Sequence, residues 1–231
     1  MTFERLPQAT FRNDQVAVAL SHSNLGGGHL GIAFHHAKDG PKVVHLAWHK
    51  LLRVEAIPQE LKACWVSTTL QIPPTASKAV VGIVRSVASR LPHVNYGINL
   101  IAAKGSFTPK GEYRPPKGSD GLTCASFVVE VLRAASVPLV KYETWREEAA
   151  NIEWAERVCR GLVESKAPQS HIDAVQKNKD NGLRLRPYEV AGAASLPMQQ
   201  RPVDFDTAQQ VGGVAEGHLQ NLCSVLQPLG A

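Results

Sequence analysis

The chain has 231 residues, of which 44% are hydrophobic, and a formal net charge of +5. This composition is ordinary for a globular protein with a sizeable core. The lysines and arginines are spread thinly along the chain, whereas a nucleic-acid-binding protein more often shows a clustered basic stripe, so we expect no nucleic-acid partner. No segment approaches the roughly 18 apolar residues that span a bilayer, and no export signal is visible, so we expect no membrane span.

The four cysteines, at positions 64, 124, 159 and 223, are far apart and form no zinc-binding spacing. A chain of this length does not need disulfides, so we expect reduced cysteines and a cytoplasmic location, with signal-independent export left open. None of the nine histidines stands in a metal-binding spacing with an acidic partner. We therefore expect neither a metal nor another cofactor.

Residues 14–72 have the pattern of a β-sheet. Short apolar runs rich in β-branched residues indicate strands over residues 16–20, 30–34, 42–48 and 64–72. The connections between these runs are too short for crossover helices, so the sheet should be mainly antiparallel.

After residue 73 the apolar spacing becomes helical. It predicts helices over residues 77–91, 123–136 and 142–162. Between the first two helices lie a short apolar piece at 96–101 and a loop at 104–121 that is rich in Gly, Pro and Lys; loops of this length are often functional. Strands followed by helices predict an α+β fold in which the antiparallel sheet packs against the second helix.

The chain beyond residue 165 becomes polar and rich in Pro, Gln and Gly. We expect a catalytic domain over residues 1–165 and a partly ordered extension over 166–231 that could pack on the same domain. Within the extension, 183–194 has an ordered pattern, whereas the last ~30 residues should be loosely structured apart from a weak helix at 213–226.

Cys124 is placed at the first turn of the second predicted helix. Backbone N–H groups at a helix N-terminus are unpaired and carry partial positive charge. They stabilise a thiolate and can bind the oxyanion of an acyl-transfer intermediate. On its own, such a cysteine is more often a small buried hydrophobe than a nucleophile.

Two histidines change that balance. His29 starts a predicted strand directly after three glycines, and His45 lies within the next apolar strand. A histidine on an apolar strand is more often a core residue, but this pair and a helix-start cysteine together supply a base, an orienting group and a nucleophile. His49, which follows the same strand, is a competitor for the orienting role.

These residues carry a resemblance to a known superfamily. The segments Gly28-His29-Leu30-Gly31-Ile32 and Val43-Val44-His45-Leu46-Ala47, followed by Leu122-Thr123-Cys124-Ala125-Ser126-Phe127-Val128, resemble the circularly permuted NlpC-type papain-like cysteine hydrolases. The lecithin:retinol acyltransferase-like branch is the most similar part of that superfamily. The order His, His, Cys is the permuted one, and the resemblance covers roughly residues 25–135.

The resemblance implies a papain-like fold with Cys124 as nucleophile, His29 as general base and His45 as the third, orienting residue. Thr123 and Tyr96 are candidate oxyanion or substrate-binding residues. Thr123 stands where that branch usually has Asn, the gap between the two histidines is longer than usual, and no membrane-anchoring tail follows. These departures disfavour lipid acyl transfer and favour a hydrolytic, bacterial-type member.

We therefore predict a cysteine hydrolase that cleaves an amide bond, in a peptide or a peptidoglycan fragment, through an acyl-enzyme on Cys124. An acyltransferase or thioesterase acting on an acyl substrate is an alternative, because the acyl-enzyme does not dictate its acceptor. A non-catalytic interaction module on the same scaffold is another, in which the cysteine and histidines are only core residues.

The hairpin between the two histidine strands offers a geometric test. A two-residue turn at 39–40 would place the imidazoles of His29 and His45 on opposite faces of the sheet. Pro41 lacks an N–H for the strand ladder, so a longer, irregular loop over 35–41 is favoured. That loop sets both imidazoles on one face, as diagonal neighbours.

Overall fold

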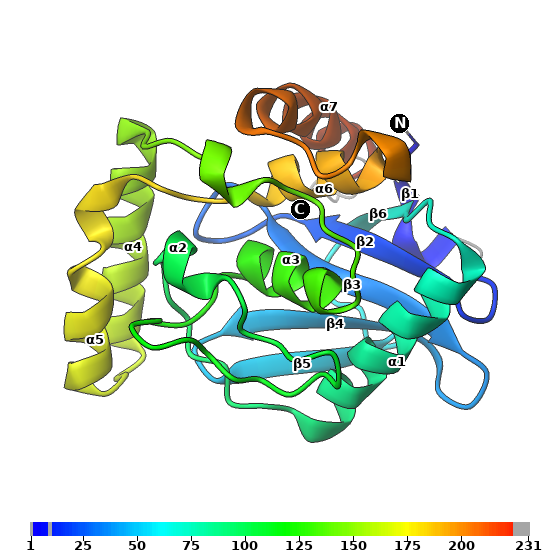
Figure 1. Ribbon diagram of the computed structural model, residues 1–231, viewed down its shortest axis with the longest axis horizontal. Helices are drawn as coiled ribbons and strands as arrows, with labels where there is room; N and C mark the ends of the chain where they lie inside the picture. The colour runs from blue at the N-terminus through cyan, green and yellow to red at the C-terminus, as the bar shows by residue number, and fades with distance from the viewer. Residues whose placement is uncertain (1, 9–10, 224–231) are drawn as a thin grey trace, which may run out of the picture.

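The apolar runs before residue 73 form a six-stranded antiparallel sheet, shown in Figure 1; the computed structural model describes residues 2–8 and 11–223. The strands are β1 (Glu4–Arg5), β2 (Val16–Ser21), β3 (His29–His36), β4 (Gly40–Trp48), β5 (Leu51–Ala56) and β6 (Trp65–Thr69). Their order across the sheet is β1-β6-β2-β3-β4-β5. The predicted α+β class with an antiparallel sheet is confirmed.

The hairpin between β3 and β4 has the favoured register but not the expected loop. Both strands continue to the pair His36 and Gly40, so the irregular loop predicted over 35–41 is wrong and the turn is confined to residues 37–39. Pro41 is tolerated because its carbonyl accepts from the Ile57 N–H, on the side away from β3, where the missing proline N–H also points.

Strand β5 was not predicted from the sequence. It follows β4 through a tight turn in which Lys50 adopts a left-handed φ of 56°, and its apolar residues alternate with polar ones only from Leu52 onward. Arg53 lies opposite His45, and Glu55 lies opposite Val43. The strand therefore brings an acidic and a basic side chain to the face of the sheet that carries His45.

The helices lie mostly on one face of the sheet (Figure 1). They are α1 (Pro74–Arg90), α2 (Leu100–Ala103), α3 (Cys124–Ala134), α4 (Ala149–Glu164), α5 (Gln169–Gln176), α6 (Pro187–Ser195) and α7 (Phe205–Cys223). Four short 3₁₀ turns cover Leu6–Gln8, Tyr142–Thr144, Lys179–Asn181 and Met198–Gln200. The helix predicted over 142–162 begins only at Ala149, because the Trp145 backbone is extended and its indole N–H donates to the Arg184 carbonyl.

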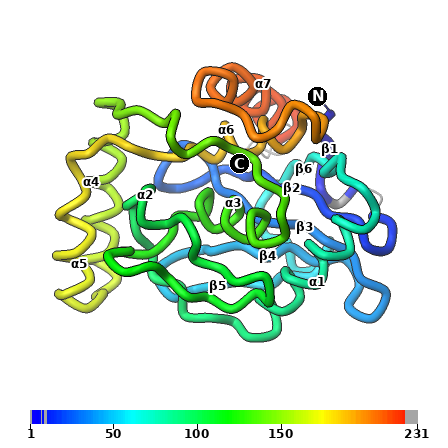
Figure 2. Tube along the Cα trace, viewed as in Figure 1, coloured from blue at the N-terminus to red at the C-terminus, as the bar shows by residue number. Residues whose placement is uncertain are grey.

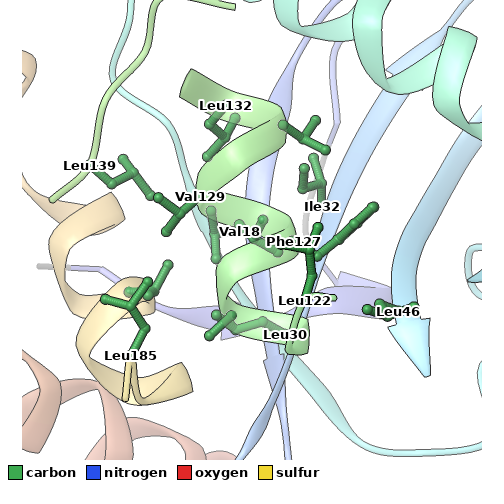
Figure 3. Close-up of a cluster of buried hydrophobic side chains, with 14 of the residues drawn as sticks. Val18, Leu30, Ile32, Leu46, Leu122, Phe127, Val129, Leu132, Leu139 and Leu185 are labelled. Atoms are coloured by element: carbon green, nitrogen blue, oxygen red, sulfur yellow. The ribbon is translucent and has the colours of Figure 1, made fainter. Parts of the chain in front are cut away.

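Helix α3 packs across the centre of the sheet, and Figure 3 shows the side chains between them. Leu30 and Ile32 project from β3 toward Phe127 and Leu132 of the helix, and all four are fully buried. Burying a side chain of this size contributes roughly 1.5–3 kcal/mol, so this contact fixes the helix on the sheet.

The other face of the sheet is covered by a smaller cluster. Its members are Leu6, Ala17, Ala19, Ala33, Val43, Ile57 and Trp65. Strand alternation places His29, Gly31 and His45 on this same face. The two histidines are therefore on one face, as predicted, and it is the face opposite the α3 core.

The C-terminal segment is more ordered than its composition predicted. Helices α6 and α7 join the main core, and in Figure 2 the orange tube of α7 lies beside the N-terminal strands. Phe3 stacks on His218 of α7, with ring centroids 5.3 Å apart. The expected loose structure is thus wrong up to residue 223, and the end of the helix predicted over 213–226 lies outside the described residues.

Two cysteines that we expected to be reduced are joined. Cys64, before β6, forms a disulfide with Cys223 at the end of α7, across a sequence separation of 159 residues. Cys124 and Cys159 are free and buried. The disulfide ties the last described helix to the sheet.

Within residues 2–8 and 11–223, none of the helices has the length and apolar character that crossing a membrane requires.

Candidate active site

Thr123 sets Cys124 at the first turn of α3. The Thr123 hydroxyl accepts the Ser126 N–H at 3.1 Å, and the Ser126 hydroxyl accepts the Thr123 N–H at 2.8 Å. This reciprocal cap satisfies two N–H groups at the helix start, next to those that Cys124 and Ala125 contribute. Because the Thr123 oxygen is used by the helix, we assign this residue to capping rather than to the substrate binding predicted from the sequence.

The Cys124 thiol is buried, with 5% of the residue exposed. Burial raises its pKa, and several groups act in the opposite direction. They are the backbone N–H of Leu30, the charge of Arg184 and the N–H groups at the start of the helix. The pocket therefore disfavours charge by its dryness but presents donors and a cation to a sulfur anion.

The Leu30 contact also locates the thiol relative to His29. The Leu30 N–H follows His29 directly in the chain, so a thiol bonded to it holds the Cα atoms of Cys124 and His29 within about 10 Å. Among the described residues, no hydrogen bond joins the thiol to the imidazole itself, which points to the far face of β3. The thiol and the imidazole therefore lie on opposite faces of the sheet, near the same end of β3.

The two predicted histidines are in direct contact. His29 Nε2 lies 2.7 Å from His45 Nδ1, and His45 Nε2 lies 3.5 Å from Glu55 Oε1. The Trp65 ring packs at an angle against both imidazoles, with centroid distances of 5.6 and 5.3 Å. His29, His45 and Glu55 thus form, in this order, a chain of polar groups on the face of the sheet opposite α3.

His45 Nε2 makes no hydrogen bond within the described residues, although the Glu55 carboxylate lies 3.5 Å away. With the hydrogen of neutral His45 on Nε2, facing that carboxylate, its Nδ1 is the acceptor. His29 must then donate from Nε2, which leaves the lone pair on its Nδ1. Burial lowers the pKa of His29 to about 3 and that of His45 to about 4, with Arg53 adding to both shifts.

Tyr96 is the second predicted residue that the structure places beside Cys124. Its backbone bridges to Leu122, just before the helix. Its hydroxyl accepts the Cys124 backbone N–H and contacts the thiol. Burial and the neighbouring sulfur both raise the pKa of Tyr96, so its hydroxyl stays protonated and can donate to an anion.

His49 does not compete with His45 for the orienting role. Its Nδ1 accepts the Tyr96 N–H at 3.4 Å, its ring packs against His171 at a tilt of 39° with the centroids 4.3 Å apart, and His171 Nε2 lies 2.9 Å from the Tyr96 carbonyl. These two histidines hold the backbone of Tyr96 from both sides. They position the tyrosine and do not contact the His29 pair.

The space beside the thiol is small and mostly closed. A cavity of about 10 Å³, the size of one water, is lined by Gly26, Gly28, Tyr96, Cys124, Trp154, Arg184 and Pro187, among others. Gly28 has φ +84°, and a Cβ there would lie 2.9 Å from the Tyr188 ring. The glycine loop and the segment leading into α6 therefore meet over Cys124.

Two residues of this site were missed in the sequence. Glu55 lies on a strand that was not predicted, and the signal that could have found it is its two-residue spacing from Arg53, the residue opposite His45. Arg184 comes from the C-terminal extension, 60 positions after Cys124 in the chain, and no short motif marks it.

Comparison with known proteins adds no relative. No family model matches the chain, and no curated protein or solved structure is significantly similar to it. The assignment of a function therefore rests on the residues and geometry of the site.

Proposed function

We propose that this chain is a papain-like cysteine hydrolase that cleaves amide bonds, with Cys124 as nucleophile, His29 as general base and His45 as the orienting residue. The observation that carries the proposal is the 2.7 Å contact between His29 Nε2 and His45 Nδ1, at the end of β3 where the next residue, Leu30, presents its N–H to the thiol. This contact uses Nε2 of His29 and holds the ring in one orientation. Nδ1 of the same ring is then the nitrogen that acts as the base.

The chemical steps follow from these atoms. The thiol proton moves to His29 Nδ1, and the sulfur attacks the carbonyl carbon of the substrate. The tetrahedral oxyanion accepts hydrogen bonds from the Tyr96 hydroxyl and the Cys124 N–H, which contact each other in the free protein. The imidazolium gives its proton to the leaving amine, and water deprotonated by His29 then releases the acyl group as a carboxylate.

Substrate binding must bring the thiol and the imidazole together. Catalytic hydrogen bonds are often long or misaligned without substrate and tighten only in the complex. The glycine loop over residues 26–28 and the segment 184–188 are the parts that must separate to admit a substrate, because they line the closed cavity. While His29 is protonated, the Glu55 carboxylate stabilises the positive charge through His45.

Three observations favour the non-catalytic alternative: burial raises the pKa of the Cys124 thiol, burial lowers the pKa of His29 to about 3, and the His29 imidazole points to the face of the sheet opposite the thiol. The deciding experiment measures alkylation of Cys124 by iodoacetamide at pH 7, with Cys159, the other free buried cysteine, as internal reference. A nucleophile served by a base should react at least about tenfold faster than Cys159. Equal, slow labelling of both would favour an interaction module.

Activity is then assayed on peptides and peptidoglycan fragments. Cys124→Ala should abolish hydrolysis, and His29→Ala should be nearly as damaging, because the two residues act as one unit. Cys159→Ala and the exposed His22→Ala are matched controls that should retain full activity. Hydrolysis by the Cys124 variant at the wild-type rate would end the proposal.

The disulfide supports a destination outside a reducing compartment. Disulfides persist in oxidising environments and are rare in the cytosol. We propose that the chain acts where Cys64 and Cys223 stay oxidised, which fits a peptidoglycan-type substrate. Thiol trapping of the protein in its native cells tests this: a fully reduced pair would favour the cytoplasmic location expected from the sequence.

A further inference from the structure

Arg184 is a buried cation that forms no ion pair within the described residues; the Glu189 carboxyl acts on its charge only from a distance. Only 8% of the residue is exposed. Its guanidinium stacks on the Trp154 ring at 3.6 Å and lies so close to Gly27 that a Cβ there would be 2.9 Å from Nη2. Among residues 2–8 and 11–223, no side-chain hydrogen bond or ion pair uses this guanidinium, and its Nε is buried without a partner. Leaving a buried charge unpaired is costly, so the position calls for an anion.

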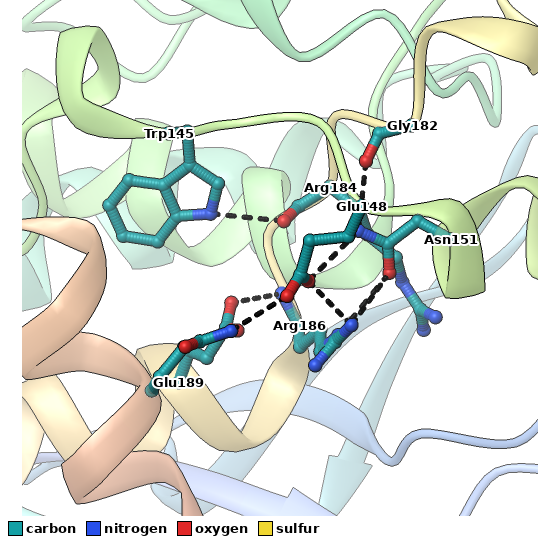
Figure 4. Close-up of polar contacts among 8 residues, drawn as sticks. Trp145, Glu148, Asn151, Gly182, Arg184, Arg186 and Glu189 are labelled. Atoms are coloured by element: carbon teal, nitrogen blue, oxygen red, sulfur yellow. Dashed lines mark hydrogen bonds and ion pairs between the residues drawn. The ribbon is translucent and has the colours of Figure 1, made fainter.

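The main chain around Arg184 is held firmly, as Figure 4 shows. Its carbonyl accepts the Trp145 indole N–H at 3.0 Å. On one side, the Gly182 carbonyl accepts the Glu148 N–H at 3.2 Å; on the other, Arg186 donates to the Glu148 carboxylate at 2.6 Å. The Glu148 carboxylate is thus paired with Arg186. The backbone on both sides of Arg184 is fixed at the position from which its side chain reaches the cavity.

The cavity that Arg184 lines also contains the reactive groups of the proposed enzyme. Cys124, Tyr96 and the N-terminus of α3 border the same space, and a second cavity of about 10 Å³, beside Asn99, is also lined by Arg184. A guanidinium presents a planar set of donors that matches a carboxylate in two-point contact. The acyl chain of a lipid has neither a charge nor a hydrogen-bond acceptor for the guanidinium.

We propose that Arg184 binds a free carboxylate of the substrate, a few bonds from the carbonyl that Cys124 attacks. This inference rests on the proposed hydrolase function and narrows its substrates to amides next to a carboxylate, such as those at an acidic or a C-terminal residue of a peptide. Arg184 then determines specificity through binding, while Cys124 and His29 carry the chemistry.

Two alkylating agents test the site without a known substrate. Iodoacetate and iodoacetamide react alike: the Cys124 sulfur forms a bond to carbon and iodide leaves. Only iodoacetate carries a carboxylate. The measured quantity is the ratio of the two labelling rates at Cys124, determined by mass mapping on the disulfide-intact protein and divided by the same ratio for free cysteine. A charged hydrogen-bond partner should raise this normalised ratio about ten- to a hundredfold.

Three variants show whether Arg184 causes the preference. Arg184→Met should return the normalised ratio to about one, and Arg184→Lys should keep part of it because the charge remains. Arg157→Met is the matched control: Arg157 is a nearby arginine, 3.9 Å from a Cβ at Gly26, that already pairs with Glu153 at 2.8 Å. Its loss should leave the ratio unchanged.

The outcomes separate the two proposals. Fast labelling of Cys124 by both agents with a wild-type ratio near one overturns the carboxylate site but leaves the nucleophile standing. An equal loss of preference in Arg157→Met and Arg184→Met would show general electrostatic attraction and would also overturn it. Labelling by neither agent in the folded protein overturns the proposed function together with this inference. Should Arg184→Met fail to fold, the wild-type ratio and Arg184→Lys still decide.

Discussion

Gly31 leaves the space that His45 needs to reach His29. A Cβ at Gly31 would lie 3.1 Å from the His45 Cβ and 2.8 Å from the nearest methyl group of Val43. Both are rigid neighbours on the adjacent strand, so neither can move away cheaply. The contact between the two imidazoles thus depends on a residue without a side chain.

We predict that Gly31→Ala destabilises the protein by about 1–3 kcal/mol, the usual cost of overpacking, and separates the two imidazoles. Urea unfolding gives the first quantity, and hydrolysis or Cys124 labelling gives the second. Gly82→Ala is the matched control: it lies in α1, nothing stands within 4 Å of its Cβ, and alanine favours a helix. Equal stability of the two variants would contradict this account of Gly31.

Glu55 offers a test of the polar chain behind the base. Glu55→Gln keeps an acceptor for His45 but removes the negative charge, so it should lower kcat by roughly tenfold, equivalent to about 1.4 kcal/mol, with little change in KM. The charge is needed only while His29 is protonated. The exposed Glu143→Gln serves as control. An unchanged kcat would show that Glu55 has no part in catalysis and that the chain of polar groups ends at His45.

The sequence was informative where its pattern is local. The strands β2, β3 and β4, the helix that starts at Cys124 and the shared face of His29 and His45 all follow from two- and 3.6-residue periods. The irregular loop was wrong because Pro41 lies at a position whose N–H faces away from β3, which depends on the pairing of β4 with β5.

The rest of the site depends on contacts that no short pattern encodes. Arg184 comes from a stretch that was expected to be ordered but carries no motif. Cys223 comes from a segment whose polar composition suggested weak order, yet α7 is a helix with a buried face. Its burial depends on the complementary surface supplied by the preceding helix α6 and by β6, which is far away in the sequence. Long-range pairing of this kind is visible only when the surfaces are assembled.

The disulfide gives a prediction about stability. A cross-link that closes a loop of 159 residues restricts the unfolded chain and can contribute up to about 5 kcal/mol in the chain-entropy model. We expect Cys223→Ala to lower Tm by about 5–15 °C, since one kcal/mol corresponds to roughly 2–4 °C at this size. Cys159→Ala, which breaks no cross-link, reports the cost of losing a buried thiol. A reducing agent should lower the wild-type Tm but not that of Cys223→Ala.

The pH dependence of stability follows from the two buried imidazoles. Burial lowers the pKa of His29 to about 3 and of His45 to about 4, whereas in the unfolded chain both titrate near 6.5. The unfolded state therefore binds more protons between these values. The stability due to the neutral imidazoles is complete above about pH 6.5 and is lost as the pH falls toward 4, at about 1.4 kcal/mol per pH unit for each histidine.

Urea unfolding between pH 5 and 7 measures this slope, in a range where most carboxylates are already ionised. His45→Gln removes one of the two titrations and eases the other, because the charge of His45 also lowers the pKa of His29. The slope should therefore be smaller in this variant by at least about 1.4 kcal/mol per pH unit at the lower end of this range, because His49 and Glu189 titrate alike in both proteins. His22→Gln, which changes an exposed histidine, should follow the wild type. Parallel curves for His45→Gln and wild type would mean that these imidazoles are not buried in their neutral form.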